Sequence, residues 1–464
     1  MRVSETGWFR PALLIVLGLT ALRWLLLLAD RTDLYVDESQ YWLWGQEFAF
    51  GYYSKPPLIG WLIGAVTTLA GSDAPFWVRM PGAALHGATA LILAAWAARV
   101  MGRREAILTA AAYATLPMVA LGSLLISTDT VMAPFYAAAL YFFARLTEDR
   151  APRFALLAGA AIGAAFMAKY AAIYFLIGVA LIQFAPAYRI GWRNGALMLG
   201  SFAVVISPNI LWNLSHKLTT FSHTVDNVGW LRGGASLNVA GMAEFLVSQA
   251  AVFGPVMLVA LVVALRRAPL AAFVVPPVAV VSVQALLGVA QANWAVAAYF
   301  AGTVLAVQVL RRYPRWMVAS FAVNAVFCIG LPFVTIATGL TFPDGKPLLD
   351  RQLGRVSMST QIIALAKANG DLPVLAISRD ISADLHYTGR DSGLSFYAPR
   401  PQGRANNHYE QRYPLPEGLK GRLLLVTSDP PDCAGPALPL DAKGGAYAKH
   451  RLAAYIVEAA CVEQ

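Results

Sequence analysis

Residues 11–29, PALLIVLGLTALRWLLLLA, form an apolar run that is long enough to cross a bilayer as one helix. Comparable runs recur along the chain as far as residue 338, and they predict an all-α polytopic membrane protein with about eleven transmembrane helices. The predicted spans lie near 11–29, 78–98, 106–126, 129–146, 154–168, 171–186, 195–213, 242–265, 269–288, 292–310 and 316–338. Two alternatives stay open here, because 153–186 could form one long tilted helix and 58–71 could form a partial or interfacial helix.

The composition supports a membrane protein. Of the 464 residues, 58% are hydrophobic and only 13% are charged, whereas soluble proteins carry charge on about a quarter of their residues. A soluble protein of this size could not cover its surface with so few charges, which excludes an ordinary cytosolic enzyme. The net charge of +10 is interpreted as a topology signal and not as a sign of nucleic-acid binding.

Charge alternates between successive connections. One set of loops carries arginines, and by the positive-inside rule it should be cytoplasmic, as should the N-terminus. This set holds Arg2, Arg10, Arg99, Arg103, Arg104, Arg145, Arg150, Arg153, Arg189, Arg193, Arg266, Arg267, Arg311, Arg312 and Arg315. The opposite loops are acidic. With an odd number of spans, everything after about residue 340 lies outside, and the first span is expected to be an uncleaved signal anchor.

The last part of the chain, residues 340–464, is expected to form a small α/β domain on the outer side, next to a membrane domain of residues 1–339. LPVLAIS (372–378) and GRLLLVTS (421–428) are short apolar runs bounded by turn residues, which is typical of strands. Ser359 to Lys367 is expected to be a short helix. Cys433 and Cys461 could form a disulfide if this domain is extracytoplasmic.

The first outer loop, residues 30–77, is the most informative segment for function. Its aromatic residues, Tyr52 and Tyr53 among them, suit an amphipathic helix at the membrane interface. Asp37 and Glu38 precede that helix, and Lys55 follows it. A carboxylate at this position could act as a general base, and a lysine could hold a phosphate. Helix capping by Asp37 and snorkelling of Lys55 are the structural alternatives.

Further ionisable residues fall at the same predicted face of the membrane. Asp129 opens the fourth span, where Ser127 and Thr128 could also cap the helix, and Lys169 has apolar neighbours on both sides. An arginine at an outer position, Arg79, departs from the charge rule and suggests an anionic partner. Two histidines in the predicted outer loop 214–241 could bind a phosphate or an acceptor, while a zinc site is weakly indicated. They are His216 and His223.

At these residues the sequence resembles the polyprenyl-phosphate-sugar-dependent glycosyltransferases with the GT-C fold. That group includes the family 39 protein O-mannosyltransferase relatives, the aminoarabinose transferases that modify lipid A, and the RgtA/B/C/D-like enzymes. The resemblance runs over about residues 10–310. It is carried, in family order, by VDESQYWLWGQ, GYYSKPPLIGWL, VRMPGAAL, STDTVMAPFYAAALYFFARL, AGAAIGAAFMAKYAAIYFL, SPNILWN and ANWAVAAYFAGTVLA.

The resemblance implies a role for each matching residue. Asp37 corresponds to the candidate base, with Glu38 beside it and Asp129 as a third catalytic candidate. Lys55 and Lys169 correspond to lysines near the donor phosphate. The remaining candidates are Arg79 and His216 for the donor phosphate, and Tyr52, Tyr53 and His223 for the sugar or acceptor. Of these, the two histidines match the family less firmly.

The expected reaction moves a sugar, with inversion, from a polyprenyl-phosphate donor to lipid A, another glycolipid or a polysaccharide. It is expected at the outer face of a bacterial inner membrane. A divalent metal is possible, but the close family generally works without one, and no cofactor is certain. The competing interpretations are a polymerase or ligase of lipid-linked glycans, a lipid or solute transporter, and a non-catalytic homologue.

Overall fold

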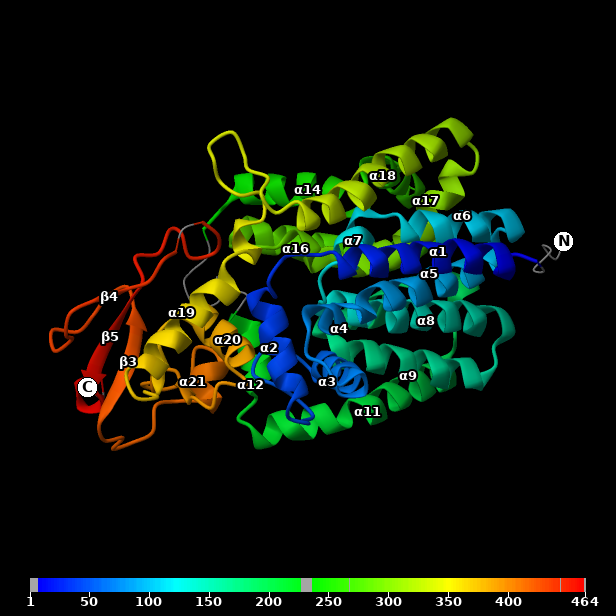
Figure 1. The fold of residues 1–464 in the computed structure, drawn as a ribbon. Coiled ribbons are helices and arrows are strands. Elements are labelled where there is room, and N and C mark those ends of the chain that lie inside the picture. Colours follow the sequence, from blue (N-terminus) through cyan, green and yellow to red (C-terminus); the bar gives the residue numbers. More distant parts are fainter. Residues whose placement is uncertain (1–6, 227–235, 267, 443, 463–464) are drawn as a thin grey trace.

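The computed structural model describes residues 7–226, 236–266, 268–442 and 444–462, and these form two parts (Figure 1). A bundle of helices runs from α1 (Phe9–Leu28) to α18 (Pro314–Ile336). A smaller C-terminal unit, residues 350–462, contains a sheet with helices packed on it. Helix α1 begins at the end of the bundle that is farthest from this unit. Arg2 and Arg267, which contribute to the predicted topology, lie outside the described residues.

The helical part accounts for all the runs that were predicted to span the membrane. Its remaining described α-helices are α2 (Val36–Gly45), α3 (Leu58–Ala70), α4 (Pro75–Arg79), α5 (Pro81–Val100), α6 (Arg103–Ala114), α7 (Pro117–Leu121), α8 (Thr128–Asp149), α9 (Pro152–Ala168), α10 (Ile173–Ile182), α11 (Trp192–Ser215), α12 (Thr219–Asp226), α14 (Val239–Phe253), α15 (Pro255–Leu265), α16 (Val275–Leu287) and α17 (Ala297–Leu310). The expected split near Lys169 is confirmed, because α9 ends at Ala168 and a 3-10 turn leads from Tyr170 into α10.

Several predicted spans are broken helices. Among the described residues, four helices are long and apolar enough to cross a membrane, or five if the pair α14 and α15, bent by 109° at Gly254 and Pro255, counts as one span. Pro117 likewise interrupts the predicted span 106–126, because proline lacks the N–H that an internal helix residue must donate. The chain is thus a multi-pass, mostly helical protein, while the count of eleven spans stays a prediction.

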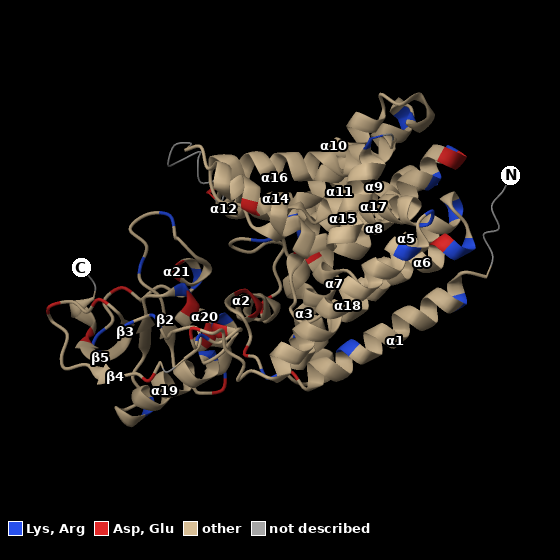
Figure 2. Cartoon of the chain, turned by 90° about the horizontal axis from the view of Figure 1, so that it is seen from above, with Lys and Arg blue, Asp and Glu red and all other residues tan. Residues whose placement is uncertain are grey.

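Charged residues gather at the two ends of the bundle (Figure 2). One group lies near the start of α1, and the other lies where the bundle meets the C-terminal unit. Between them the buried core is built from apolar and aromatic side chains, such as Tyr136, Phe175 and Phe300. This separation is what a bilayer requires of helices that cross it.

The C-terminal unit contains a mixed five-stranded sheet in the order β2-β1-β3-β5-β4. The first three strands are parallel, and β5 runs antiparallel to both β3 and β4. The two strands expected from the sequence are confirmed as β1 and β3, and the expected short helix lies within α19. The elements are α19 (Arg355–Ala368), β1 (Val374–Ala376), α20 (Arg379–Thr388), β2 (Phe396–Tyr397), α21 (His408–Arg412), β3 (Arg422–Thr427), β4 (Leu438–Pro439) and β5 (Ala453–Glu458).

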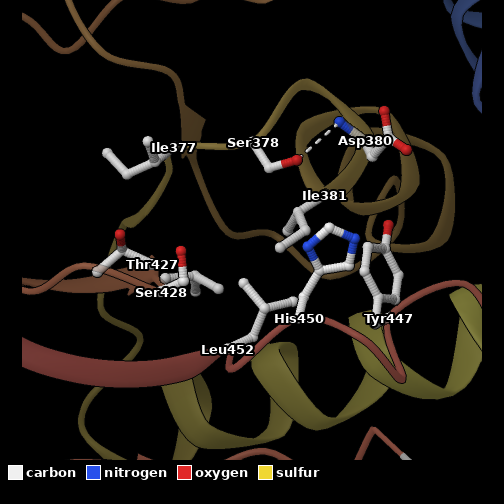
Figure 3. A pocket seen from close by; sticks show the side chains of 10 residues that line it. Ile377, Ser378, Asp380, Ile381, Thr427, Ser428, Tyr447, His450 and Leu452 are labelled. Carbon is white, nitrogen blue, oxygen red and sulfur yellow. Dashed lines mark hydrogen bonds between the residues drawn. The ribbon is translucent and has the colours of Figure 1, made fainter.

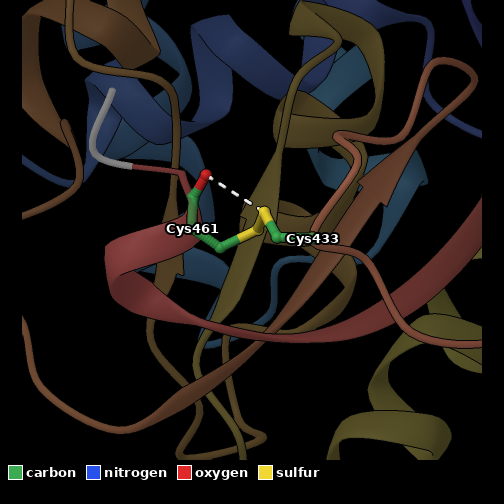
Figure 4. Close-up of a disulfide and its surroundings, with 2 residues drawn as sticks. All are labelled: Cys433 and Cys461. Atoms are coloured by element: carbon green, nitrogen blue, oxygen red, sulfur yellow. Dashed lines mark hydrogen bonds between the residues drawn. A yellow bond between two sulfur atoms is a disulfide. The ribbon is translucent and has the colours of Figure 1, made fainter.

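Both faces of this sheet are covered. Leu424 and Val426 of β3 pack on one face with residues of α19 and α20, while Leu423 and Leu425 pack on the other. Successive side chains of a strand point to opposite faces, so an uninterrupted apolar strand such as β3 needs cover on both sides. Cys433 and Cys461 form a disulfide that joins the loop after β3 to the residues after β5 (Figure 4).

Candidate active site

Helix α2 places two adjacent carboxylates at the junction between the bundle and the C-terminal unit. Asp37 and Glu38 lie within its first turn, whereas the sequence predicted them just before the helix. Negative charge in a first turn interacts favourably with the helix dipole. Glu38 also accepts a hydrogen bond from the backbone N–H of Tyr35 at 3.0 Å, which completes a capping box. The far end of α2 lies directly on α3, since a Cβ added to Gly64 would clash with the carbonyl oxygen of Gly45.

Both carboxylate oxygens of Glu38 bind groups of the protein itself. Its Oε1 and Oε2 accept hydrogen bonds from Arg79 Nε at 3.0 Å and from Arg79 Nη2 at 2.8 Å. Its Oε1 also accepts one from the backbone N–H of Ile126 at 3.1 Å. The side chains of Glu38 and Arg79 are 2% and 1% exposed. The partner expected for Arg79 is therefore this carboxylate, and its predicted contact with the donor phosphate finds no support in the geometry.

Asp37 faces the opposite way and remains accessible. Its side chain is 46% exposed, and Oδ1 accepts a hydrogen bond from Arg379 Nη2 at 2.6 Å. Its Oδ2 makes no hydrogen bond with the residues that the structure describes. The sequence did not reveal Arg379, which follows Asp37 by 342 positions. Arg379 does open α20 just after the end of β1 at Ala376, and the carboxyl ends of parallel strands are where binding residues of such sheets gather.

A cavity of about 390 Å³ opens beside the first outer loop. It is lined by Ser54, Lys55, Pro56, Lys169, Tyr170, Ala171, Ile173, Tyr174, Thr224, Val280, Val281, Gln284 and Trp294. The side chain of Lys55 makes no hydrogen bond or ion pair with any described residue. Burial lowers the pKa of Lys55, as does the nearby charge of Lys169. An ammonium group without a partner in a mostly apolar cavity is a strong candidate for binding an anion.

Lys169 lines the same cavity but already has a partner. Its Nζ donates to both carboxylate oxygens of Asp129, at 2.6 and 2.8 Å. Asp129 Oδ2 also accepts a hydrogen bond from Asn293 at 2.7 Å. Ser127, and not Asp129, caps α8, because its hydroxyl accepts from the backbone N–H of Thr130. The carboxylate of Asp129 is therefore used to hold Lys169 and Asn293 and not to cap the helix. Asn293 was not predicted, although it lies in the motif ANWAVAAYF.

The aromatic and histidine candidates differ in their positions. Tyr52 is buried against Trp44 and donates its hydroxyl to backbone carbonyls, so it holds the loop in place. Tyr53 packs against His223 of α12, with ring centroids 5.1 Å apart. Burial, together with the charge of Lys55, lowers the pKa of His223 to about 4, and the ring is neutral at pH 7. His216 is exposed and stacks on a tryptophan of α11, and its predicted phosphate contact finds no support in the geometry.

The C-terminal unit covers this site from outside the bundle. Helices α2 and α20 lie side by side (Figures 1 and 2). Asp33 Oδ2 accepts a hydrogen bond from the backbone N–H of Arg355 at 2.8 Å, so the outer loop supplies the cap of α19. Val36 and Tyr409 meet in a buried apolar cluster at the same interface. The site is thus assembled from segments at opposite ends of the chain.

A second cavity, of about 340 Å³, lies within the C-terminal unit at the carboxyl ends of β1 and β3 (Figure 3). Ser378 and Asp380 line it, together with His450 from a loop. Arg379 lies between these two residues in sequence but reaches to α2 instead. In the part of the chain that the structure describes, no group of three or more His, Cys, Asp or Glu residues is arranged to hold a metal ion.

Comparisons with known proteins agree with this architecture. Residues 54–212 match the family model described as dolichyl-phosphate-mannose-protein mannosyltransferase. The chain is 39% identical over 438 residues, 92% of its length and 92% of the relative's, to the lipid A galacturonosyltransferase RgtD of Rhizobium johnstonii. Its fold matches ArnT from Cupriavidus metallidurans bound to undecaprenyl phosphate, with a TM-score of 0.66 and 14% identity over 97% of this chain and 99% of ArnT. The apo form of ArnT gives a TM-score of 0.65 and 13% identity, over 97% and 98% of the two chains.

Proposed function

Because this chain belongs to the family of polyprenyl-phosphate-sugar-dependent membrane glycosyltransferases that includes the RgtD relative, we propose that it transfers galacturonic acid from a polyprenyl phosphate to lipid A. The sugar and the acceptor are those named for the relative. The undecaprenyl phosphate bound to the structurally similar ArnT supports a lipid-linked donor. Transfer at the outer face of a bacterial inner membrane agrees with the disulfide of the C-terminal unit, since disulfides persist in oxidising compartments.

The observation that carries this proposal is the unpartnered ammonium of Lys55 in the cavity. A phosphate bound there would neutralise a half-buried charge that forms no ion pair with the described residues. Lys169 lines the same cavity, so both lysines can face one anion. The cavity walls contributed by Ile173 and Val280 are apolar, which suits the start of a polyprenyl chain.

In the proposed mechanism, Asp37 is the general base. Its accessible Oδ2 takes the proton from an acceptor hydroxyl, and the hydroxyl oxygen forms a bond to the anomeric carbon of the sugar. The bond from that carbon to the phosphate oxygen breaks on the opposite face, which inverts the anomeric configuration. Lys55, supported by Lys169, stabilises the negative charge that develops on the departing polyprenyl phosphate. A donor placed in this way contributes on the order of 2.7 to 4 kcal/mol to lowering the barrier.

The other candidates take supporting roles in this proposal. Glu38, held by Arg79, fixes the first turn of α2 and thereby the position of Asp37. Asp129 keeps Lys169 in the cavity wall. Tyr53 and the neutral ring of His223 are proposed to contact the sugar or the acceptor, because Tyr53 belongs to the first outer loop and His223 packs against it.

The experiment that tests the proposal is a transfer assay with the full chain in lipid nanodiscs. Polyprenyl phosphates carrying galacturonic acid, aminoarabinose or mannose are offered separately, with lipid A or a serine- and threonine-rich peptide as acceptor. We expect mass spectrometry to find lipid A that has gained one galacturonic acid. Transfer of mannose to the peptide, or no transfer of galacturonic acid to lipid A, would contradict the proposal.

A further inference from the structure

Among the described residues, Arg379 is the only one of the C-terminal unit that binds the exposed carboxylate of Asp37. We propose that Arg379, positioned by Gln40, binds the carboxylate of the transferred sugar and so selects a uronic acid over a neutral hexose. This inference rests on the proposed function, since it concerns the donor bound at the same site. Nothing in the comparisons assigns a role to this arginine.

Hydrogen bonds fix the guanidinium of Arg379 and leave some of its N–H groups unused. Gln40 lies one helical turn after Asp37 on the same face of α2 and is 2% exposed. Its Oε1 accepts from Arg379 Nε at 3.1 Å and from Arg379 Nη2 at 3.0 Å. Arg379 Nη1 makes no hydrogen bond with the described residues, and the side chain is 37% exposed. A planar guanidinium that is held through Nε and Nη2 and can still donate from Nη1 suits recognition of a further carboxylate.

Arg379 contacts the proposed base, because its Nη2 donates a hydrogen bond to Asp37 Oδ1 at 2.6 Å. A sugar that reacts beside Asp37 must therefore approach this guanidinium. Burial is the main cause that lowers the pKa of Lys55, and the positive charge of Arg379 lowers it further. The same charge also acts on His223, after the larger effects of burial and Lys55. The same arginine thus contacts the proposed base and acts electrostatically on Lys55 and His223.

The charges of the site explain why a uronic acid would need this arginine. A donor with a galacturonic acid carries negative charge on both its phosphate and its sugar, and the sugar must approach Asp37. Two carboxylates that meet without a cation repel each other. Lys55 serves the phosphate and Lys169 is paired with Asp129, so Arg379 is the cation left to stand between Asp37 and the sugar.

Contacts other than those of Arg379 also join the C-terminal unit to the bundle. Arg412 forms an ion pair with Glu47 across the same interface, and Tyr409 packs against Val36. Ser378 and Asp380, the neighbours of Arg379, line the other cavity. Arg412 therefore offers a matched control, because its loss removes an ion pair between the two parts without touching the site.

The test measures binding to the full chain in nanodiscs, and it needs neither acceptor nor turnover. Three ligands are compared: a polyprenyl phosphate without sugar, the same lipid with galacturonic acid, and the same lipid with galactose. The proteins are the wild type, Arg379→Gln, Arg379→Lys and Arg412→Gln. We expect Arg379→Gln to bind the galacturonic acid donor about 10- to 100-fold more weakly, as for a lost hydrogen bond to a charged group. Its affinity for the other two ligands should not change, and Arg379→Lys should recover part of the loss.

Two results would overturn the inference while leaving the proposed function intact. In one, Arg379→Gln binds the galacturonic acid donor as tightly as the wild type does. In the other, it loses affinity for all three ligands by the same factor, as a purely structural residue would. A wild type that binds the bare lipid phosphate but gains nothing from galacturonic acid would instead overturn both proposals. Arg412→Gln should match the wild type with every ligand.

Discussion

At the scale of single residues, the two carboxylates of α2 show how adjacent positions acquire different tasks. Consecutive residues of an α-helix point about 100° apart, so Glu38 turns into the protein while Asp37 turns out of it. Glu38 is sealed in a pair with Arg79, whereas Asp37 keeps an oxygen free at the surface. Sequence alone identified both as acids of one motif. The sequence could not distinguish their roles, because the partner of each carboxylate comes from a distant segment.

The buried pair predicts a stability defect. Glu38→Ala leaves the guanidinium of Arg79 buried without its main partner, and breaking such a pair costs about 3–5 kcal/mol. We expect a clearly lower thermal unfolding midpoint in detergent. Glu47→Ala removes the exposed ion pair with Arg412 and should cost about 1 kcal/mol or less. Equal midpoints for the two variants would contradict the structural role of Glu38.

For Lys55 we predict the opposite result, a loss of activity without a loss of stability. Lys55→Met removes a charge that has no partner among the described residues, so the unfolding midpoint should hold or rise. Transfer should fall about 10²- to 10³-fold, since the leaving phosphate loses its main cation. Lys169→Met is the matched comparison, and it should lose both activity and stability because Asp129 is left without its cation. A fully active Lys55→Met would remove the lysine from the mechanism.

At the scale of elements, the sequence predicted where helices lie better than how they are divided. Every predicted span contains helix, and the strands predicted within residues 372–378 and 421–428 are present. Helices are interrupted at Pro117 and at Gly254–Pro255, although hydropathy predicts one continuous span at each place. Hydropathy measures only how apolar a residue is, and it does not show that proline lacks a backbone N–H. Arg379 and Asn293 escaped prediction for another reason. Their contacts form only when segments far apart in the chain are brought together.

The disulfide predicts how the C-terminal unit responds to reduction. It joins residues 28 positions apart, and closing a loop of that size is worth about 3–4 kcal/mol by the chain-entropy model. We expect a reducing agent, or the double variant Cys433→Ser/Cys461→Ser, to lower the unfolding midpoint of this unit. Cys328→Ser, at the one free cysteine of the described chain, should respond to reduction as the wild type does. A wild-type midpoint unaffected by reduction would contradict the prediction.

At the scale of the whole molecule, the site exists because the C-terminal unit folds back onto the first outer loop. Asp33 caps α19, and Arg379 reaches Asp37. The sequence predicted an outer domain and an acidic outer loop, but it did not predict that the two contact each other. Their contact combines small contributions from many residues, none of which forms a motif by itself.

This interface predicts a dependence of stability on pH. Burial lowers the pKa of His386 to about 4 and that of His408 to about 3. Between pH 6.5 and 4 the unfolded chain binds protons that the folded chain does not, so acidification destabilises the fold by about 1.4 kcal/mol per pH unit for each histidine. The thermal midpoint should therefore fall as the pH drops through this range.

His408→Phe provides the control for this effect. The ring of His408 packs edge-on against Trp44, and its Nδ1 has no hydrogen-bond partner among the described residues. Phenylalanine keeps the ring contact but cannot bind a proton, so the midpoint of this variant should fall less steeply with acid. An identical dependence in the variant and the wild type would assign the effect to other groups.

The central claim is that Asp37 acts as a base in a site shared by the bundle and the C-terminal unit. The most direct measurement is the rate of galacturonic acid transfer to lipid A by the wild type and by Asp37→Asn, with donor affinity and the thermal midpoint measured on the same samples. A general base contributes about 10²- to 10⁴-fold, so we predict a loss of that size with little change in affinity or midpoint. Asp37→Asn that transfers at the wild-type rate would contradict the account.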